Sequence, residues 1–236
     1  MPASFRKHRK AGGIRALLRR LVLWSIALLL GWYGLCIAGL VALKWINPPT
    51  TGIQIQRRIE SLLVRGPYKK RYQFVPAARI SRHLRHAVIA AEDTRFYQHR
   101  GIDWKAVQEV AAESLEEGEV PRGASTITQQ LVKNLFLTTH RSAIRKALEF
   151  SLVPFTELIL SKDRILELYL NVVEFGPGVF GAEAAAQYHY KISASDLSRE
   201  QAARLAAILP SPRKRKPNRM DRYAAIILQR MRIMGW

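Results

Sequence analysis

The feature that most constrains this chain is an uncharged stretch of 23 residues, Leu21 to Leu43. A helix of about 20 apolar residues spans the hydrocarbon core of a bilayer, so the stretch predicts one transmembrane helix. A cleaved signal peptide is the alternative, but its apolar region is shorter, roughly 7 to 15 residues, and ends in small residues. Here Lys44, Trp45 and Ile46 follow. We therefore expect a membrane anchor.

The charge distribution predicts how the anchor is oriented. Residues 1–20 contain seven Lys and Arg and no acidic residue, which places the N-terminus in the cytoplasm and the rest of the chain outside. Residues 1–46 hold eight of the 38 Lys and Arg and none of the 18 Asp and Glu, so the remainder keeps a charge of +12. An anionic partner such as phospholipid, a phosphorylated substrate or nucleic acid is expected. The only cysteine, Cys36, excludes an intrachain disulfide.

Beyond the anchor, the pattern predicts a mainly α class. We expect a cytoplasmic segment over 1–20, the transmembrane helix over 21–43, a linker and membrane-proximal segment over 44–60, and one domain over 61–236. Residues suited to cap helices stand before apolar residues at helical spacing. They are Ser81, Asp103, Ser125, Ser142, Ser161 and Ser198. Pro154 is expected to kink or interrupt its helix.

Two segments combine residue types that suit chemistry. Residues 92–101, EDTRFYQHRG, place paired carboxylates, an aromatic ring and a histidine at the end of a helix; solvated acids at a helix end, or a metal site, are the alternatives. In the second segment, Thr126, Gln130 and Lys133 form a polar stripe that ends in a cation. The neighbouring apolar residues fit either the core or a bilayer surface equally well. These are Leu131, Leu135, Phe136 and Leu137.

Four segments occur in the order found in the peptidoglycan glycosyltransferase family, and the chain resembles a monofunctional member of it. They are EDTRFYQHRG at 92–101, GASTITQQLVKN at 123–134, RKALE at 145–149 and KDRILELYLN at 162–171. The resemblance implies a lysozyme-like helical lobe with a small membrane-proximal lobe. It also implies an enzyme of the bacterial inner membrane that polymerises lipid II, an undecaprenyl-diphosphate disaccharide-pentapeptide, into β-1,4 glycan strands by inverting transfer.

The resemblance also assigns roles to residues. Glu92 matches the base that deprotonates the acceptor hydroxyl, and Glu149 matches a glutamate that assists at the donor. The residues expected to bind substrate are Asp93, Phe96, His99, Ser125, Thr126, Gln130, Lys133, Arg141, Arg145, Lys146 and Asn171. No residue is assigned to a resident metal. Whether Mg²⁺ or Mn²⁺ shares the diphosphate charge is left open by the sequence.

The expected partners are lipid II, the nascent glycan strand, membrane lipid and other proteins of cell-wall synthesis and division, but no nucleic acid. Two other functions are weighed against polymerisation. A membrane-anchored peptidoglycan hydrolase would use a catalytic glutamate without a diphosphate clamp. A non-catalytic basic envelope scaffold would use clusters such as Arg213 to Lys216, and salt-sensitive binding without turnover would indicate it.

Overall fold

The computed structural model describes the backbone of residues 5–64, 68–117 and 125–236, and the side chains of 15–64, 68–113 and 125–236. Gly123 and Ala124, which begin the second sequence motif, lie outside the described residues. The chain divides into two compact units, residues 1–42 and 43–236. Each unit is described by itself.

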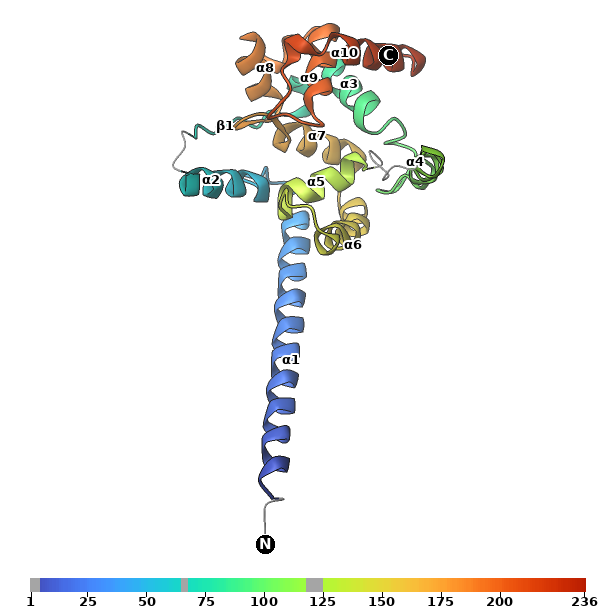
Figure 1. Ribbon diagram of the computed structural model, residues 1–236. Coiled ribbons are helices and arrows are strands. Elements are labelled where there is room, and N and C mark those ends of the chain that lie inside the picture. The colour runs from blue at the N-terminus through green and yellow to red at the C-terminus, as the bar shows by residue number, and fades with distance from the viewer. Residues whose placement is uncertain (1–4, 65–67, 118–124) are drawn as a thin grey trace. The chain divides into compact units, whose positions relative to one another are not determined.

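The first unit contains one long helix, α1 (Phe5–Ala42), drawn in blue in Figure 1. Its segment Arg15–Ala42 is long and apolar enough to cross a membrane. Leu21, Trp24, Leu28 and Leu35 are all more than half exposed, at 55%, 69%, 72% and 75%. A helix with apolar side chains exposed around its circumference is typical of one that is solvated by lipid. The predicted transmembrane helix is thus present as a helix, and it is consistent with a membrane anchor.

The second unit is mainly helical, as predicted (Figure 1). Its α-helices are α2 (Gly52–Val64), α3 (Arg82–Glu92), α4 (Trp104–Glu117), α5 (Ile127–Phe136), α6 (Ala143–Ile159), α7 (Lys162–Val172), α8 (Ala182–Tyr190), α9 (Arg199–Ile208) and α10 (Asp221–Ile233). Three strands, β1 (Arg71–Tyr72), β2 (Glu174–Gly176) and β3 (Val179–Phe180), form a small sheet of order β1-β3-β2. β3 pairs parallel to β1 and antiparallel to β2.

Side-chain caps start the helices where the sequence predicted them, with one correction. Ser81, Ser142, Ser161 and Ser198 each accept a backbone N–H in the first turn of the following helix. The cap of α5 is Thr126 instead of Ser125, because Gln129 completes a reciprocal capping box with Thr126.

Pro154 lies inside α6 without interrupting it, contrary to one of the two outcomes expected. Proline removes one backbone hydrogen bond of a helix. The carbonyl that loses its partner belongs to Phe150, which is half-buried, and Pro154 itself is exposed.

Two groups of packed helices form the core. In the first, α3 packs on α9 and α10, burying Leu84, Leu205 and Ile227 completely. In the second, α5 packs between α6 and α7 and also contacts α2. Leu131, Leu135 and Leu137 are at most 8% exposed, so for these three residues the structure favours core packing. Phe136, the fourth residue of the prediction, is only half-buried.

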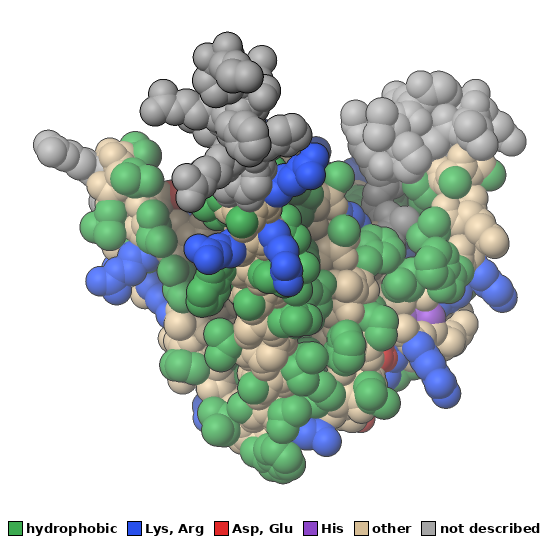
Figure 2. All heavy atoms as spheres, turned by 90° about the horizontal axis from the view of Figure 1, so that it is seen from below, with side chains coloured by type: hydrophobic (Ala, Val, Ile, Leu, Met, Phe, Trp, Pro, Cys, Tyr) green, Lys and Arg blue, Asp and Glu red, His purple; other side chains and the backbone are tan. Residues whose placement is uncertain are grey.

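Apolar side chains are exposed instead on α2 and α6. They are Ile55, Ile59, Leu62, Leu63 and Val64 on α2, and Ile144, Phe155 and Leu158 on α6. Figure 2, which views the molecule from below, shows many apolar side chains interspersed with Lys and Arg. Apolar surface beside cations suits contact with a lipid surface.

Candidate active site

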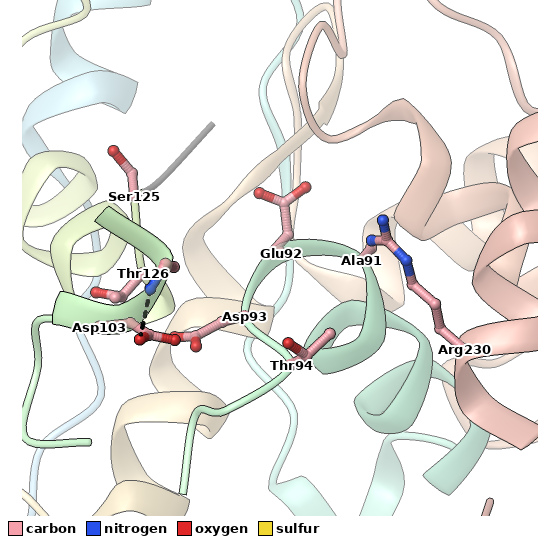
Figure 3. A pocket seen from close by; sticks show the side chains of 9 residues that line it. Ala91, Glu92, Asp93, Thr94, Asp103, Ser125, Thr126 and Arg230 are labelled. Atoms are coloured by element: carbon pink, nitrogen blue, oxygen red, sulfur yellow. Dashed lines mark hydrogen bonds between the residues drawn. The ribbon is translucent and has the colours of Figure 1, made fainter. Parts of the chain in front are cut away.

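Glu92 is the last residue of α3, and its neighbour Asp93 caps the end of that helix. Figure 3 shows the two carboxylates pointing in different directions, with Asp93 directed toward Asp103 and Thr126. They line a pocket of about 160 Å³ between the end of α3, the starts of α4 and α5, and Arg230 of α10. The end of one helix thus presents one carboxylate to the pocket and directs the other toward the start of α5.

Glu92 is held by a hydrogen bond that crosses from α3 to α5. Gln130 Nε2 donates to Glu92 Oε2 at 2.6 Å, and Tyr169 of α7 donates its hydroxyl to Gln130 Oε1 at 2.8 Å. Burial raises the pKa of Glu92 above its ordinary value, against the opposing effects of the Gln130 hydrogen bond and the charge of Lys133. A carboxyl with a raised pKa is better suited to accept a proton near neutral pH than an ordinary glutamate.

Asp93 and His99 fasten the loop after α3 to the start of α5. Asp93 Oδ2 accepts the backbone N–H of Ile127 at 3.0 Å, while Oδ1 lies 2.9 Å from His99 Nε2. The N–H of Gly101 donates to His99 Nδ1 at 3.1 Å, so the ring proton is on Nε2 and points at Asp93. The Asp93 carboxylate is almost completely buried, so its visible role is structural.

The same loop is closed by Phe96, Gly101 and Thr126. Phe96 is fully buried, and Lys162 Nζ lies 4.5 Å from its ring centroid. Thr126 Oγ1 donates to the carbonyl of Gly101 at 2.6 Å. Gly101 has φ +89°, and a Cβ there would lie 2.3 Å from Val153 Cγ1. Substrate contact by Asp93, Phe96, His99 and Thr126 stays a prediction, because the structure shows them holding the loop and the start of α5.

Glu149 on α6 is the centre of a cluster of charges. Its carboxylate is buried and accepts from Arg145 Nη1 and Lys146 Nζ, both at 2.5 Å. Lys146 Nζ also donates to Ser125 Oγ at 3.1 Å, which joins α6 to the residue before the α5 cap. Two cations around one carboxylate leave a local excess of positive charge.

Lys133 is a cation influenced by both carboxylates. Burial lowers its pKa, whereas the charges of Glu149 and Glu92 raise it. It makes no hydrogen bond or ion pair with any residue that the structure describes, and neither does exposed Arg141, just before α6. An uncommitted cation near an ion cluster is suited to binding a phosphate.

Asn171 is the predicted site residue that the structure does not bring to this group. It is fully buried, and its amide exchanges hydrogen bonds with the backbone N–H and carbonyl of Val75, at 2.8 and 2.9 Å. Its side chain ties α7 to the segment before α3. Substrate contact at Asn171 stays a prediction that this position does not support.

Sequence reasoning missed three residues near Glu92. Tyr169 lies inside the motif at 162–171, but no role was predicted for it. Arg230 lines the pocket of Glu92 and donates to the carbonyl of Ala90 at 3.3 Å, and the charge of Arg215 acts on Glu92. Arg215 lies in the basic run from Arg213 to Lys216 and Arg230 lies on α10, and the location of both relative to Glu92 is revealed only by the fold.

Asp93, His99 and Asp103 offer three ligand atoms within 4.8 Å of one another, the geometry of a candidate metal site. Each side chain is already engaged, however. Asp103 Oδ2 accepts from Arg95 Nε at 2.8 Å, and its Oδ1 accepts the N–H of Ala106 at 3.0 Å. A cation would have to displace these bonds, so the cluster is built as internal support.

The chain thus consists of an apolar helix suited to a membrane anchor and a helical unit. In the helical unit the buried carboxylate of Glu149 is paired with two cations, Arg145 and Lys146. A sequence profile described as transglycosylase matches residues 58–232. The chain therefore belongs to the transglycosylase family.

Among its relatives is the biosynthetic peptidoglycan transglycosylase of Ectopseudomonas mendocina, 46% identical over 94% of this chain and 91% of that protein. The proteins of the same name from Pseudomonas entomophila and Dechloromonas aromatica are 47% and 44% identical. These two alignments cover 90% and 91% of this chain, and 88% and 94% of the relatives.

Proposed function

We propose that the protein polymerises lipid II into β-1,4 glycan strands by inverting glycosyl transfer and releases undecaprenyl diphosphate. The observation that carries this proposal concerns Lys133, because this one cation is under the influence of the charges of both Glu92 and the Glu149 ion cluster. A base and a phosphate-binding group are the two elements that transfer from a sugar diphosphate requires. Membership of the transglycosylase family supports the same reaction.

In the proposed step, Glu92 removes the proton of the acceptor's 4-hydroxyl while that oxygen bonds to the donor's anomeric carbon. The bond from that carbon to the phosphate oxygen breaks on the opposite face, so the configuration inverts from α to β. Lys133 and Arg141 stabilise the departing diphosphate by charge. Glu149 acts indirectly, because its carboxylate holds Arg145 and Lys146 in place.

No step of this mechanism needs a resident metal. Glu149, the carboxylate nearest to the cations, is paired with two of them and so offers a divalent ion no uncommitted oxygen. A cation that shares the diphosphate charge would arrive with the substrate.

The membrane arrangement is part of the proposal. α1 anchors the chain, the basic segment before it stays in the cytoplasm, and the second unit lies outside the bacterial inner membrane. The exposed apolar residues of α2 and α6 would contact the lipid surface in which the substrate's undecaprenyl chain is held.

The pairing of Glu149 argues against the hydrolase alternative. A glycosidase generally uses two carboxyl groups, one as acid and one as base or nucleophile. Glu92 has the raised pKa suited to one such role, but both oxygens of the Glu149 carboxylate already accept from cations, Arg145 and Lys146, so the second role has no free carboxyl group.

The test uses the full-length protein in detergent, with lipid II and, separately, preformed glycan strands as substrates. Polymer is expected from lipid II, with loss of turnover in Glu92→Gln and retention in Glu200→Gln, an exposed glutamate on α9. Shortened glycan without polymer would make the protein a hydrolase. Salt-sensitive binding without turnover of either substrate would favour the scaffold.

A further inference from the structure

Tyr169 is fully buried on α7, yet its hydroxyl reaches the candidate active site. The chain of hydrogen bonds from Tyr169 through Gln130 to Glu92 joins α7, α5 and α3, with lengths of 2.8 and 2.6 Å. Tyr169 does not line the pocket of Glu92, and the hydrogen-bonded route between the two residues runs through Gln130.

The surroundings of Gln130 fix which way its amide faces. Nε2 lies toward two acceptors, Glu92 Oε2 at 2.6 Å and the carbonyl of Ser125 at 3.4 Å. A carboxylate and a carbonyl can only accept, so the NH₂ group must face them. Oε1 is thereby left facing Tyr169, which satisfies it by donating its hydroxyl.

The hydroxyl of Tyr169 remains a donor at every pH at which such an enzyme works. Burial, together with the negative charges of Glu92 and Asp93, raises the pKa of Tyr169 well above its ordinary value. Among the described residues, α7 provides no other hydrogen bond to the Gln130 amide.

We propose that Tyr169 is a positioning residue: its hydroxyl locks the Gln130 amide so that the NH₂ group stabilises the deprotonated carboxylate of Glu92. The proposal rests on the proposed function, in which Glu92 is the base. Without the hydroxyl, Oε1 of Gln130 loses this donor. The amide can then turn so that Oε1 accepts a hydrogen bond from the neutral carboxyl of Glu92, which favours the protonated form that cannot act as a base.

The experiment measures polymerisation against pH for the full chain in detergent, with lipid II as substrate. Tyr169→Phe is expected to move the acidic limb of the rate profile upward by about one pH unit, comparable to one hydrogen bond to a carboxylate. The rate at high pH is expected to stay close to that of the unchanged protein. Gln130→Met, which removes the amide, is expected to produce the upward shift by itself.

A double variant separates positioning from general damage. If Tyr169 acts only through Gln130, adding Tyr169→Phe to Gln130→Met leaves the acidic limb where Gln130→Met put it. Tyr72→Phe is the matched control, because it also removes a tyrosine hydroxyl that donates a hydrogen bond, in this case to the backbone carbonyl of Pro48 at 2.5 Å. Its acidic limb is expected to stay in place.

Two results would overturn the proposal: an equal loss of rate at every pH in Tyr169→Phe, or a second shift in the double variant. An unshifted limb in Tyr169→Phe, with Glu92→Gln inactive, would refute the role of Tyr169 and leave the proposed function intact. Turnover retained in Glu92→Gln would instead refute the assignment of the base.

Discussion

Replacing Gly101 by alanine tests how the loop after α3 is held. Gly101 has φ +89°, and the left-handed region costs an ordinary residue about 1–2 kcal/mol. The added Cβ would lie 2.3 Å from Val153 Cγ1 and 2.9 Å from Glu157 Cγ, and overpacking of this kind costs about 1–3 kcal/mol more. We expect Gly101→Ala to lower the free energy of unfolding by about 2–5 kcal/mol. At roughly 3 °C per kcal/mol for a unit of this size, Tm falls by about 6–15 °C.

Thermal unfolding of the full chain in detergent measures this effect, and Gly235→Ala is the matched control. Gly235 has φ +79°, but no atom lies within 4 Å of a Cβ built there. Its substitution carries only the backbone cost, about 3–6 °C. Val153→Ala should recover part of the Gly101→Ala loss by removing the clashing methyl group. If Gly101→Ala and Gly235→Ala melt at the same temperature, the steric argument is wrong.

Three further outcomes are expected. The polymerisation rate should fall at a pH above 4.5, the ordinary pKa of a glutamate, because burial raises the pKa of Glu92 and only its deprotonated form is a base. A rate still at its maximum at pH 4.5 would contradict this assignment. Lys133→Ala should lower turnover by about 10²–10³-fold, as the loss of one group that stabilises charge in the transition state does. Lys105→Ala, which removes an exposed lysine on α4, should leave turnover unchanged. Equal turnover in the two variants would refute the role of Lys133 at the diphosphate. Arg57→Met should lower the free energy of unfolding, measured with denaturant, by about 3–5 kcal/mol, because it leaves buried Glu174 without its partner 3.1 Å away. Adding Glu174→Gln should restore part of this loss, and a double variant with no restored stability would exclude the unpaired carboxylate as the cause.

The helices could be predicted because their signals are local. Ser142, Ser161 and Ser198 each precede apolar residues at helical spacing, and each caps a helix in the structure. The start of α5 was misplaced by one residue because two neighbouring hydroxyl residues both fit a cap. The partner that decides between them, Gln129, lies three residues beyond Thr126.

The arrangement of the site was less predictable, because a motif shows which side chains occur together but not where each one points. Asn171 is in a motif, and yet its amide bonds to the backbone of Val75, which is 96 residues away in sequence, and to the carbonyl of Glu167. Nothing in the helical pattern gave Tyr169 a polar role, because its hydroxyl finds its acceptor, the Gln130 side chain, only on α5. Tertiary contacts of this length leave no local signal in a single sequence.

The side chains of Glu92 and Asp93 point in different directions and make different contacts, so mutations at these two adjacent codons should cause two different kinds of defect. Asp93 holds the backbone of Ile127 and the ring of His99, whereas the Glu92 carboxylate accepts, among the described residues, from the side chain of Gln130 alone. Substitutions at Asp93 should therefore reduce the amount of folded protein in the cell, and substitutions at Glu92 should leave that amount normal and the protein inert. When a variant is produced together with the unchanged enzyme, only the second class would bind substrate without making product, so only it would act as a dominant inhibitor.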